Sequence, residues 1–367
     1  MIEMRNVRTN IFMVTFVLVC IGVVMIYSAS AIYAYSNTGD SLYFLKRHLL
    51  CLLIGYALMF AAMSVDIREI RKYSKPILGL SILLLVLVLI PHIGKEISGA
   101  KRWFKLGPIN FQPSEFAKIA IVIYMADLIT RKGNRMKEFF FGYLPAIIVL
   151  GAVVGLVLLE PDLGTAVTIS VITFIMLFVG GARGIHIMIC FLASIPALYL
   201  LIFHSAYRMR RILAFLNPWA DKRGVGFQII QSFVALGSGG LFGVGLGQSR
   251  QKLFYLPASH TDFIFSIIGE ELGFLGTLSI VALFTIFVWQ GMRVVFKTVG
   301  MFERMLSLGI VSIIAFEVII NIGVTAGAFP TKGLPLPFIS YGGSGLIFHL
   351  MAIGLLLNVA KVCETYR

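Results

Sequence analysis

Three carboxylates lie in or beside an apolar stretch near residue 265, and their spacing limits the chemistry they could do. The stretch reads YLPASHTDFIFSIIGEELG over residues 255–273, with Asp262 near its start and Glu270 and Glu271 inside it. On a helix Glu270 lies about 12 Å beyond Asp262 and Glu271 points elsewhere, so the three cannot form one cluster. Asp262 stands alone at the water boundary, where a carboxylate can take a proton from a hydroxyl nucleophile as a general base. Capping of the following helix explains Asp262 equally well.

A second pair of ionisable residues stands in the apolar segment FQPSEFAKIAIVIY. Glu115 and Lys118 are three residues apart, so on a helix they share one face and can pair. A charge inside a bilayer costs about 2.5–3.5 kcal/mol on insertion scales, and a salt bridge offsets part of that cost. We predict a supporting rather than a catalytic role for this pair. Glu270 and Glu271 are likewise expected to pair with Lys118 or with backbone groups and to hold their helix in register.

Two acids stand in the turn EPDLGTA at residues 160–166. Asp162 precedes a helical segment and is predicted to cap it. Glu160 is expected to be solvated. Neither residue is predicted to be catalytic.

The segment TKGLPLPFISYGGSG, residues 331–345, cannot form a regular helix because it contains Pro335 and Pro337. Non-helical backbone near membrane depth is tolerated where it is buried in protein or lines a watery cavity, and cavity lining is the prediction here. A glycine-rich start of a helix also offers free backbone N–H groups to an anion. Candidate substrate contacts are Ser340, Tyr341 and Ser344, with His260 beside Asp262.

The composition places these residues in an integral membrane protein. Of the 367 residues, 59% are hydrophobic and only 13% are charged, about half the charged fraction of a soluble domain. The apolar residues form blocks near the ~20 residues that cross a bilayer. We predict one all-α polytopic membrane domain over residues 1–367. Its ten expected spans are residues 11–33, 47–64, 76–92, 115–130, 143–159, 164–180, 185–204, 262–290, 305–325 and 344–361.

The distribution of bases predicts the orientation. Short loops on one side are dense in Lys and Arg, which marks that side as cytoplasmic, and an even number of spans places both termini there. The opposite, outer face also carries bases, which suit either anionic lipid headgroups or an anionic ligand such as a diphosphate. The net charge of +14 is split between two membrane faces and makes no case for nucleic acid. The outer bases are Lys46, Arg47, Lys95, Lys101, Arg102, Lys105, Arg208, Arg210, Arg211, Lys222, Arg223, Arg250 and Lys252.

The longest outer loop, about residues 205–261, is expected to belong to the active region. Within it GFQIIQSFVAL places Phe227, Ile230 and Val234 at helical spacing, which predicts a helix lying in the membrane interface. The following glycines lack the spacing of a dinucleotide site, so we predict turns whose backbone approaches a neighbour closely. The four cysteines lack metal-site or disulfide spacing and are predicted to be buried hydrophobes.

Four long segments together resemble the SEDS family of cell-wall polymerases. The resemblance extends over nearly the whole chain, and within the family it is closer to FtsW and the sporulation protein SpoVE than to RodA. The segments are GAKRWFKLGPINFQPSEFAKIA (99–120), EPDLGTA (160–166), a run from NPWADKRGVG to FSIIGEELG (217–273) and KGLPLPFISYGGSG (332–345).

The resemblance implies a peptidoglycan glycosyltransferase that extends glycan strands from lipid II at the outer face of the bacterial cytoplasmic membrane. The family's essential acid falls on Asp262, and its transmembrane acid–base pair falls on Glu115 and Lys118. Family members work beside a class B penicillin-binding protein and other divisome proteins, so this chain is expected at a septum, during cell division or sporulation. Two departures are Ala258, where division members carry an acid, and Gly345 in SYGGSG, where SYGGSS is usual.

The expected reaction is a single inverting displacement. Asp262 removes a proton from the acceptor hydroxyl, and undecaprenyl diphosphate leaves the donor sugar. Arg102, Arg250 and Lys252 are the predicted diphosphate contacts, with a divalent cation (Mg²⁺ or Mn²⁺) shared with the substrate as the alternative. No organic cofactor is expected. Two other functions fit the same sequence, a lipid II flippase and a membrane scaffold for the penicillin-binding protein.

Overall fold

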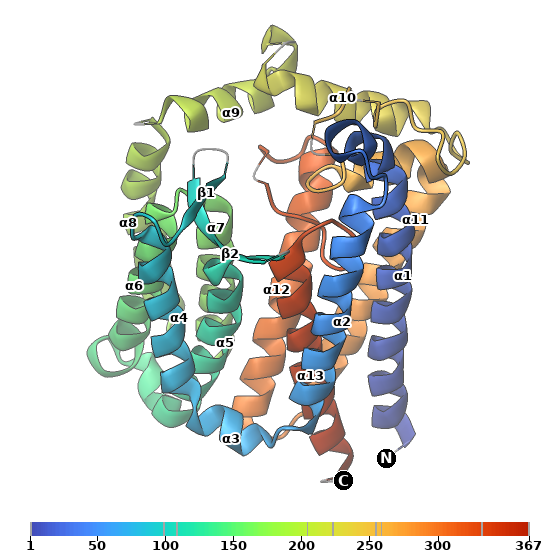
Figure 1. Ribbon diagram of the computed structural model, residues 1–367. Coiled ribbons are helices and arrows are strands. Elements are labelled where there is room, and N and C mark those ends of the chain that lie inside the picture. Colours follow the sequence, from blue (N-terminus) through green and yellow to red (C-terminus); the bar gives the residue numbers. More distant parts are fainter. Residues whose placement is uncertain are drawn as a thin grey trace.

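A computed structural model describes residues 2–97, 100–107, 109–203, 205–221, 224–253, 255–257, 259–331 and 333–365. Ala258, the first departure from the family pattern, lies outside these residues. Most of the described chain is helical (Figure 1). The α-helices are α1 (Ile2–Thr38), α2 (Tyr43–Ser64), α3 (Ile67–Lys72), α4 (Ser74–Leu89), α5 (Pro113–Lys132), α6 (Leu144–Leu159), α7 (Leu163–Val179), α8 (Gly184–Phe203), α9 (Ala206–Leu216), α10 (Val225–Ser238), α11 (Ile264–Lys297), α12 (Met301–Thr325) and α13 (Gly343–Thr365). Short 3-10 helices occupy Gly133–Lys137 and Pro218–Asp221, and a π-helical turn occupies Phe139–Tyr143.

Each predicted span falls on one helix of the structure: α1, α2, α4 to α8, and α11 to α13. Six of the described helices are long and apolar enough to cross a membrane, and α4, α7 and α8 contain shorter apolar stretches. The α5 helix completes the set, although it carries Glu115, Lys118 and Asp127, all of which are buried. The predicted membrane fold is therefore confirmed.

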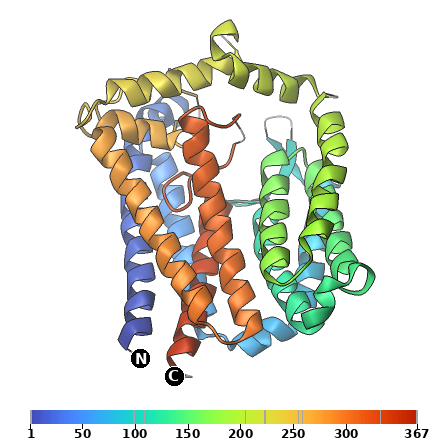
Figure 2. The same cartoon turned by 180° about the vertical axis from the view of Figure 1, so that it is seen from behind.

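The helices form two groups that meet along the middle of the molecule (Figures 1 and 2). One group contains α4 to α8. The other contains α1, α2 and α11 to α13, with α13 packed along α2 and α1 packed along α11. The α12 helix packs against α5 and α7 and joins the groups. Both termini lie at the same end of the bundle, as an even number of spans requires.

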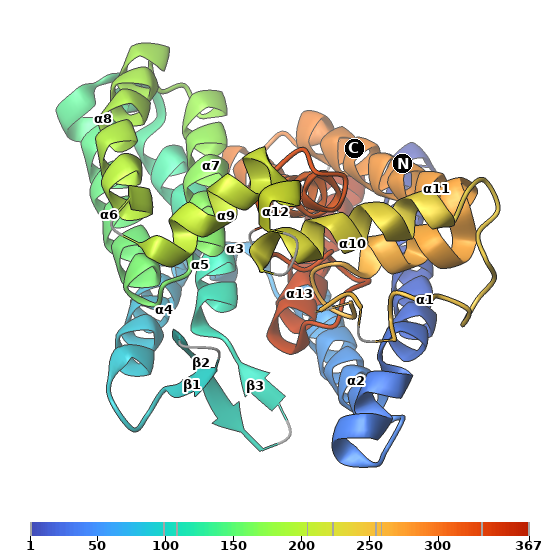
Figure 3. The ribbon, with the colours of Figure 1, turned by 90° about the horizontal axis from the view of Figure 1, so that it is seen from above.

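At the opposite end, α9 and α10 lie across the bundle rather than along it (Figures 1 and 3). The α10 helix confirms the interfacial helix predicted from GFQIIQSFVAL. The α9 helix, AYRMRRILAFL, was not predicted. It carries Arg208, Arg210 and Arg211 together with exposed Leu213 and Leu216, the mixture of bases and apolar side chains typical of a helix at a membrane surface.

A small antiparallel sheet is the departure from an all-α chain. Its order is β1-β2-β3, with β1 (Lys95–Ile97), β2 (Ala100–Leu106) and β3 (Ile109–Phe111). Two strands have only three residues, too few for an alternating pattern to be recognised. The rings of Phe104 and Phe111 stack at 6.2 Å across β2 and β3. The sheet leads directly into α5, so it positions the start of that helix.

The α11 helix is interrupted at Gly273, whose φ of 70° is outside the helical range. The broken turn exposes backbone N–H and C=O groups. The glycine-rich loop, residues 239–253 after α10, forms hydrogen bonds with them. Phe274 N donates to Gly240 O at 2.9 Å, and Val244 N donates to Glu270 O at 2.9 Å. A Cβ at Gly243 would clash with the carbonyl of Glu271. The predicted close backbone approach is therefore confirmed, and its neighbour is α11 itself.

Candidate active site

Asp262 lies two residues before α11 and does not cap it. The residue at the cap position is Phe263, and no side chain makes a capping hydrogen bond there. Within the described residues, the Asp262 carboxylate has no hydrogen-bonding or ion-pairing partner of its own. The residue is only partly buried. The capping explanation is thus wrong, and the role of Asp262 as a proton acceptor stays a prediction.

Burial raises the pKa of the Asp262 carboxyl to about 6, and the positive charge of Arg211 partly opposes that rise. A raised pKa makes the carboxylate a stronger base while leaving it mostly ionised at neutral pH. Arg211 lies on α9 and donates through its Nη1 to Thr331 O at 3.0 Å. The α9 helix therefore brings Arg211 close to Asp262. The sequence analysis did not single out this arginine among the outer bases.

The backbone around Asp262 is fixed by the segment that contains Pro335 and Pro337, called the proline-containing segment below. The Asn321 amide on α12 donates to Asp262 O at 2.9 Å and to Leu334 O at 2.8 Å. Tyr341 N donates to His260 O at 3.0 Å. Gly333 comes so close that a Cβ there would lie 3.4 Å from the Asp262 carboxylate. Two segments far apart in sequence thus hold one carboxylate in place.

The proline-containing segment is non-helical and buried in protein, with Leu336, Phe338 and Ile339 almost fully covered. Ser340 Oγ donates to Thr261 O at 2.7 Å and accepts from Leu336 N at 2.8 Å. Ser344 Oγ donates to Asn110 O at 2.6 Å and joins β3 to the start of α13. Both hydroxyls hold backbone in place, while their predicted contacts with substrate stay predictions.

His260 sits in an aromatic cluster with Tyr33, Phe44 and Tyr341. Its ring centroid lies 4.6 Å from that of Phe44, 5.5 Å from that of Tyr33 and 5.9 Å from that of Tyr341. Burial lowers the pKa of His260 to about 4, so the ring is neutral at physiological pH. The cluster binds the segment before α11 to α1 and α2. Substrate contact by His260 or Tyr341 stays a prediction.

The predicted pair of Glu115 and Lys118 forms, but it belongs to a larger network. Lys118 Nζ lies 2.9 Å from Glu115 Oε2 and also pairs with Glu317 on α12. His349 on α13 lies 2.8 Å from Glu317. All four side chains are buried. The sequence analysis missed Glu317 and His349, although each stands in an apolar span, where an ionisable residue is costly.

Glu270 and Glu271 bind the glycine-rich loop instead of Lys118, so the predicted pairing with Lys118 was wrong and the predicted pairing with backbone groups is confirmed. Glu270 accepts from Arg250 N at 2.9 Å and from the hydroxyl of Ser249. Glu271 accepts from Lys252 Nζ at 2.9 Å and from Ser28 Oγ at 2.7 Å. The α11 interruption at Gly273 follows at once, so both acids serve to dock the loop onto the broken helix.

The three bases predicted to meet a diphosphate have different surroundings. Lys252 is buried against Glu271, and this ion pair takes the place of the predicted diphosphate contact. Arg102 on β2 donates to Glu160 O at 2.8 Å and to Pro161 O at 2.7 Å. Arg250 is exposed. Of these three bases, Arg250 is therefore the one whose side chain is left open to a ligand.

The turn after α6 differs from the prediction at one acid. Asp162 caps α7, as expected, by accepting from Thr165 N at 3.1 Å. Glu160 is not solvated: its side chain is fully covered, and neither carboxylate oxygen has a hydrogen-bond partner within the described structure. Burial and the neighbouring Asp162 raise its pKa to about 8. Glu160 is therefore neutral at pH 7.

Among the described residues, no three His, Cys, Asp or Glu side chains gather as metal ligands. Asp262 offers one partly exposed carboxylate. A magnesium ion commonly takes one or two protein carboxylates and completes its shell with water and substrate phosphates. The residues therefore fit a cation carried with a diphosphate, and a metal requirement stays a prediction.

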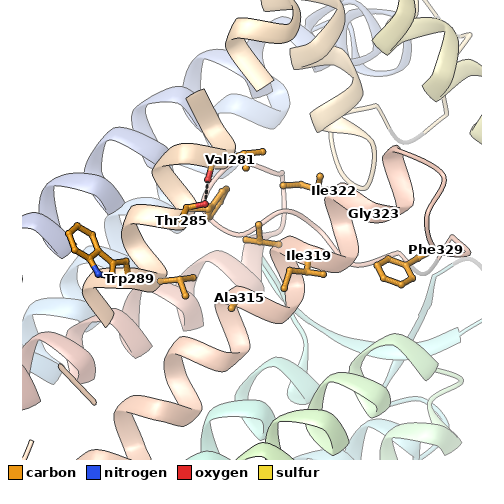
Figure 4. A pocket seen from close by; sticks show the side chains of 11 residues that line it. Val281, Thr285, Trp289, Ala315, Ile319, Ile322, Gly323 and Phe329 are labelled. Atoms are coloured by element: carbon orange, nitrogen blue, oxygen red, sulfur yellow. Dashed lines mark hydrogen bonds between the residues drawn. The ribbon is translucent and has the colours of Figure 1, made fainter. Parts of the chain in front are cut away.

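A separate apolar cavity of about 620 Å³ opens between α11 and α12 (Figure 4). Its lining includes Val281, Trp289, Ile319 and Phe329, with Thr285 as a polar member. The Thr285 hydroxyl donates to Val281 O at 2.8 Å within its own helix. This surface can contact apolar chains or helices but contains no group that could activate a hydroxyl.

Comparisons with known proteins agree over nearly the full length. A family model described as "Cell cycle protein", covering FtsW, RodA and SpoVE, matches residues 8–365. A probable peptidoglycan glycosyltransferase FtsW of Trichlorobacter lovleyi is 49% identical, over 92% of this chain and 89% of that protein. Stage V sporulation protein E of Bacillus subtilis is 44% identical, over 95% of each chain.

Two solved structures share the fold. A chain of a peptidoglycan synthase complex that coordinates polymerization and crosslinking has a TM-score of 0.79 and 31% identity, covering 96% of this chain and 97% of that one. The rod shape determining protein RodA of Thermus thermophilus has a TM-score of 0.71 and 29% identity, covering 96% and 95%.

Proposed function

Because this chain belongs to the FtsW, RodA and SpoVE family of cell cycle proteins, we propose that it polymerises lipid II with Asp262 as the general base. Its close relatives are peptidoglycan glycosyltransferases, and this chain is a glycosyltransferase of the same kind. The assignment of Asp262 rests on the surroundings of its carboxylate. It has no protein partner among the described residues, lies at the water boundary and stands on backbone fixed by α12 and the proline-containing segment.

The proposed step is one inverting displacement. The acceptor's GlcNAc 4-hydroxyl gives its proton to the Asp262 carboxylate while its oxygen bonds to C1 of the donor's MurNAc. The C1–O bond to the diphosphate breaks, and undecaprenyl diphosphate leaves with the electron pair. An α-linked donor thereby becomes a β-1,4 glycan. A diphosphate leaves without a proton if its charge is stabilised, so one carboxylate suffices.

Arg211 and Arg250 are the proposed source of that stabilisation. Arg211 is close enough to Asp262 to lower its pKa, and Arg250 is exposed on the loop that Glu270 anchors. Fixed positive charges aimed at a developing anion often accelerate a reaction more than any other feature of an active site. A divalent cation carried with the diphosphate would supply further positive charge at the same place. Arg102 and Lys252 act instead by holding the β-sheet and the glycine-rich loop.

The proposed orientation places the Asp262 end outside the cell and both termini in the cytoplasm. The inner segments would then include the base-rich stretches around α3 and after α5, which agrees with the positive-inside rule. The relative in a synthase complex that couples polymerization to crosslinking supports a class B penicillin-binding protein as partner, at the division or sporulation septum.

Transport of lipid II is the competing function, and the interruption of α11 at Gly273 is the observation that favours it. Broken helices line the binding sites of many transporters. Here the broken turn is closed by the backbone of the glycine-rich loop, whereas a transport site would leave those groups for a substrate. Glycosyl transfer is therefore the better supported function.

The test compares wild type with Asp262→Asn, each reconstituted in vesicles with its partner and supplied with lipid II. Asp40→Asn is the matched control, because Asp40 is an exposed acid near the same end of the bundle that pairs with Lys46. We expect glycan polymer from wild type and Asp40→Asn and almost none from Asp262→Asn. Equal polymer from all three would remove Asp262 from the reaction. Lipid II crossing the vesicles without any polymer would favour the transporter.

A further inference from the structure

The end of the bundle that carries both termini contains a basic cavity of about 400 Å³ between α3, the start of α4 and the end of α5. It lies far along the helices from Asp262 and takes no part in the proposed reaction. Its lining consists of five bases, one acid and one hydroxyl: Arg68, Arg71, Lys72, Lys75, Arg131, Asp127 and Ser74.

The floor of the cavity is formed by two buried polar side chains, Asp127 and Ser74. Asp127 is 5% exposed and accepts from Arg71 Nε at 3.2 Å and from Arg131 Nε at 2.8 Å. Ser74, which is 1% exposed, donates to the same carboxylate at 3.0 Å. One carboxylate thus orients two guanidinium groups that come from different helices. A guanidinium has five N–H donors in a fixed fork, so each arginine keeps donors for a second acceptor.

The charges do not cancel. Asp127 is the one acid among the lining residues, so Arg71, Arg131 and Lys75 alone set three positive charges against one negative charge. Lys72 also lies 3.6 Å from Glu69, but both of those side chains are more than half exposed, and an exposed pair of this kind contributes about 0–1 kcal/mol. An excess of positive charge in a concave site at a helix-bundle end favours a compact anion with several acceptor oxygens, which is the chemistry of a phosphate.

The surface next to the cavity selects the kind of phosphate. Tyr73 lies between Lys72 and Lys75 and is 50% exposed, and α4 continues with exposed Leu80 and Leu83. At spacings of seven and three residues the three side chains share one helix face, so an apolar stripe continues from the bases along α4. A soluble phosphate has no apolar group that could contact such a stripe, whereas the acyl chains of a phospholipid would lie along it.

We propose that this cavity, lined by Arg71, Arg131 and Lys75, binds the phosphate headgroup of an anionic phospholipid in the inner leaflet. Basic cavities between transmembrane helices on the cytoplasmic side commonly hold such headgroups. The inference rests on the proposed orientation and not on the catalytic role of Asp262. A bound lipid would link α4 to α5 and so stabilise the helix that carries Glu115 and Lys118.

The test uses the full chain in detergent and native mass spectrometry after titration with phosphatidylglycerol or, separately, phosphatidylcholine. The variant is Lys72→Gln with Lys75→Gln, which removes two lining bases and leaves the Asp127 cluster intact. Arg135→Gln with Lys137→Gln is the matched control. It removes the same charge from exposed residues that directly follow α5 at the same end of the bundle and do not line the cavity.

We expect each lysine that lines the cavity to contribute about fivefold to binding of the headgroup, so the cavity variant should bind phosphatidylglycerol about 25-fold more weakly. The control should bind like wild type, and phosphatidylcholine should bind weakly to all three proteins. Equal losses in both variants would mean general attraction to charge and would overturn the proposal. Displacement of the lipid by millimolar glycerol 3-phosphate would show that a soluble phosphate is the ligand instead. Lys75→Gln alone, with about a fivefold effect, decides the matter if the double variant does not fold.

Discussion

The acids of this protein differ sharply in what surrounds the carboxylate. Glu115 and Glu317 pair with Lys118 between two helices, α5 and α12, and Glu271 pairs with Lys252. Asp262 is held only through its backbone, by Asn321 and the proline-containing segment. Its carboxylate has no partner within the described residues, and the residue is partly open to solvent.

The difference separates acids that maintain the fold from the acid that can react. A buried charge without a partner costs several kcal/mol, so an acid within the bundle must be paired or neutral. Glu160, which has no partner among the described residues, is neutral at pH 7 because its pKa is raised to about 8. Asp262 needs no such partner because it is partly exposed, so solvent can reach its carboxylate.

The largest effect should come from Asp262→Asn. Loss of a general base lowers a rate by about 10²–10⁴-fold. The same change removes a charge that burial disfavours, since the Asp262 pKa is raised, so the thermal midpoint should stay equal or rise. Initial polymerisation rates and unfolding curves in the same detergent check both statements. A variant that loses activity and stability together would place Asp262 among the structural acids.

Lys118→Met should act through the fold. Removing one member of a buried ion pair costs about 3–5 kcal/mol, because Glu115 and Glu317 are left without their cation. Lys46→Met is the control, since its pair with Asp40 is exposed and contributes about 0–1 kcal/mol. Denaturant unfolding in detergent measures both variants. Adding Glu317→Gln to Lys118→Met should recover part of the loss, and no recovery would argue against the network.

The paired acids were only half predictable from sequence. Glu115 and Lys118 are three residues apart on one helix, so their pairing follows from helical spacing alone. Glu317 and His349 come from helices about 200 residues farther along the chain. Their burial could be suspected from sequence, but their partners depend on how α5, α12 and α13 pack.

Six of the ten spans were predictable because each is a long apolar block, and the shorter α4, α7 and α8 and the charged α5 still stand out as apolar stretches between polar loops. The sheet was missed because two of its three strands have only three residues. The α9 helix was missed because its three arginines lower the mean hydropathy of a segment that has one apolar face. Lys252 was assigned to a diphosphate because it stands in a basic outer loop. The sequence could not reveal that the loop folds back onto α11 and pairs Lys252 with Glu271.

The docking of that loop can be tested with two glycines. Gly243 and Gly247 both have a φ of 79°. An alanine at either position pays about 1–2 kcal/mol for the left-handed conformation. At Gly243 the new methyl group would also clash with Glu271 O, whereas nothing lies near Gly247. We expect Gly243→Ala to cost about 1–3 kcal/mol more than Gly247→Ala in thermal or denaturant unfolding. Equal costs would show that the loop backbone can move away from Glu271 O with little loss of stability, and that the close contact at Gly243 is not required.

The pH dependence of the rate reports on Asp262 directly. A general base works in its ionised form, and the pKa of Asp262 is about 6. The rate should therefore be nearly constant above pH 7 and fall below pH 6, reaching about a tenth of its maximum at pH 5. Rates of wild type in buffers of constant ionic strength provide the check. A fall centred near pH 4 would mean that an acid with an ordinary pKa controls the reaction.

The smallest effect is a shift of that midpoint in Arg211→Gln. The charge of Arg211 favours the ionised form of Asp262 and lowers its pKa, so its removal should move the midpoint upward, to a pH above 6. Arg250→Gln is the control, because Arg250 is exposed on the glycine-rich loop and should leave the midpoint unchanged. If both arginines contact the diphosphate, both variants lose rate at pH 8, and the midpoint alone separates them. An unchanged midpoint in Arg211→Gln would mean that α9 does not hold its base near the acid in the working enzyme.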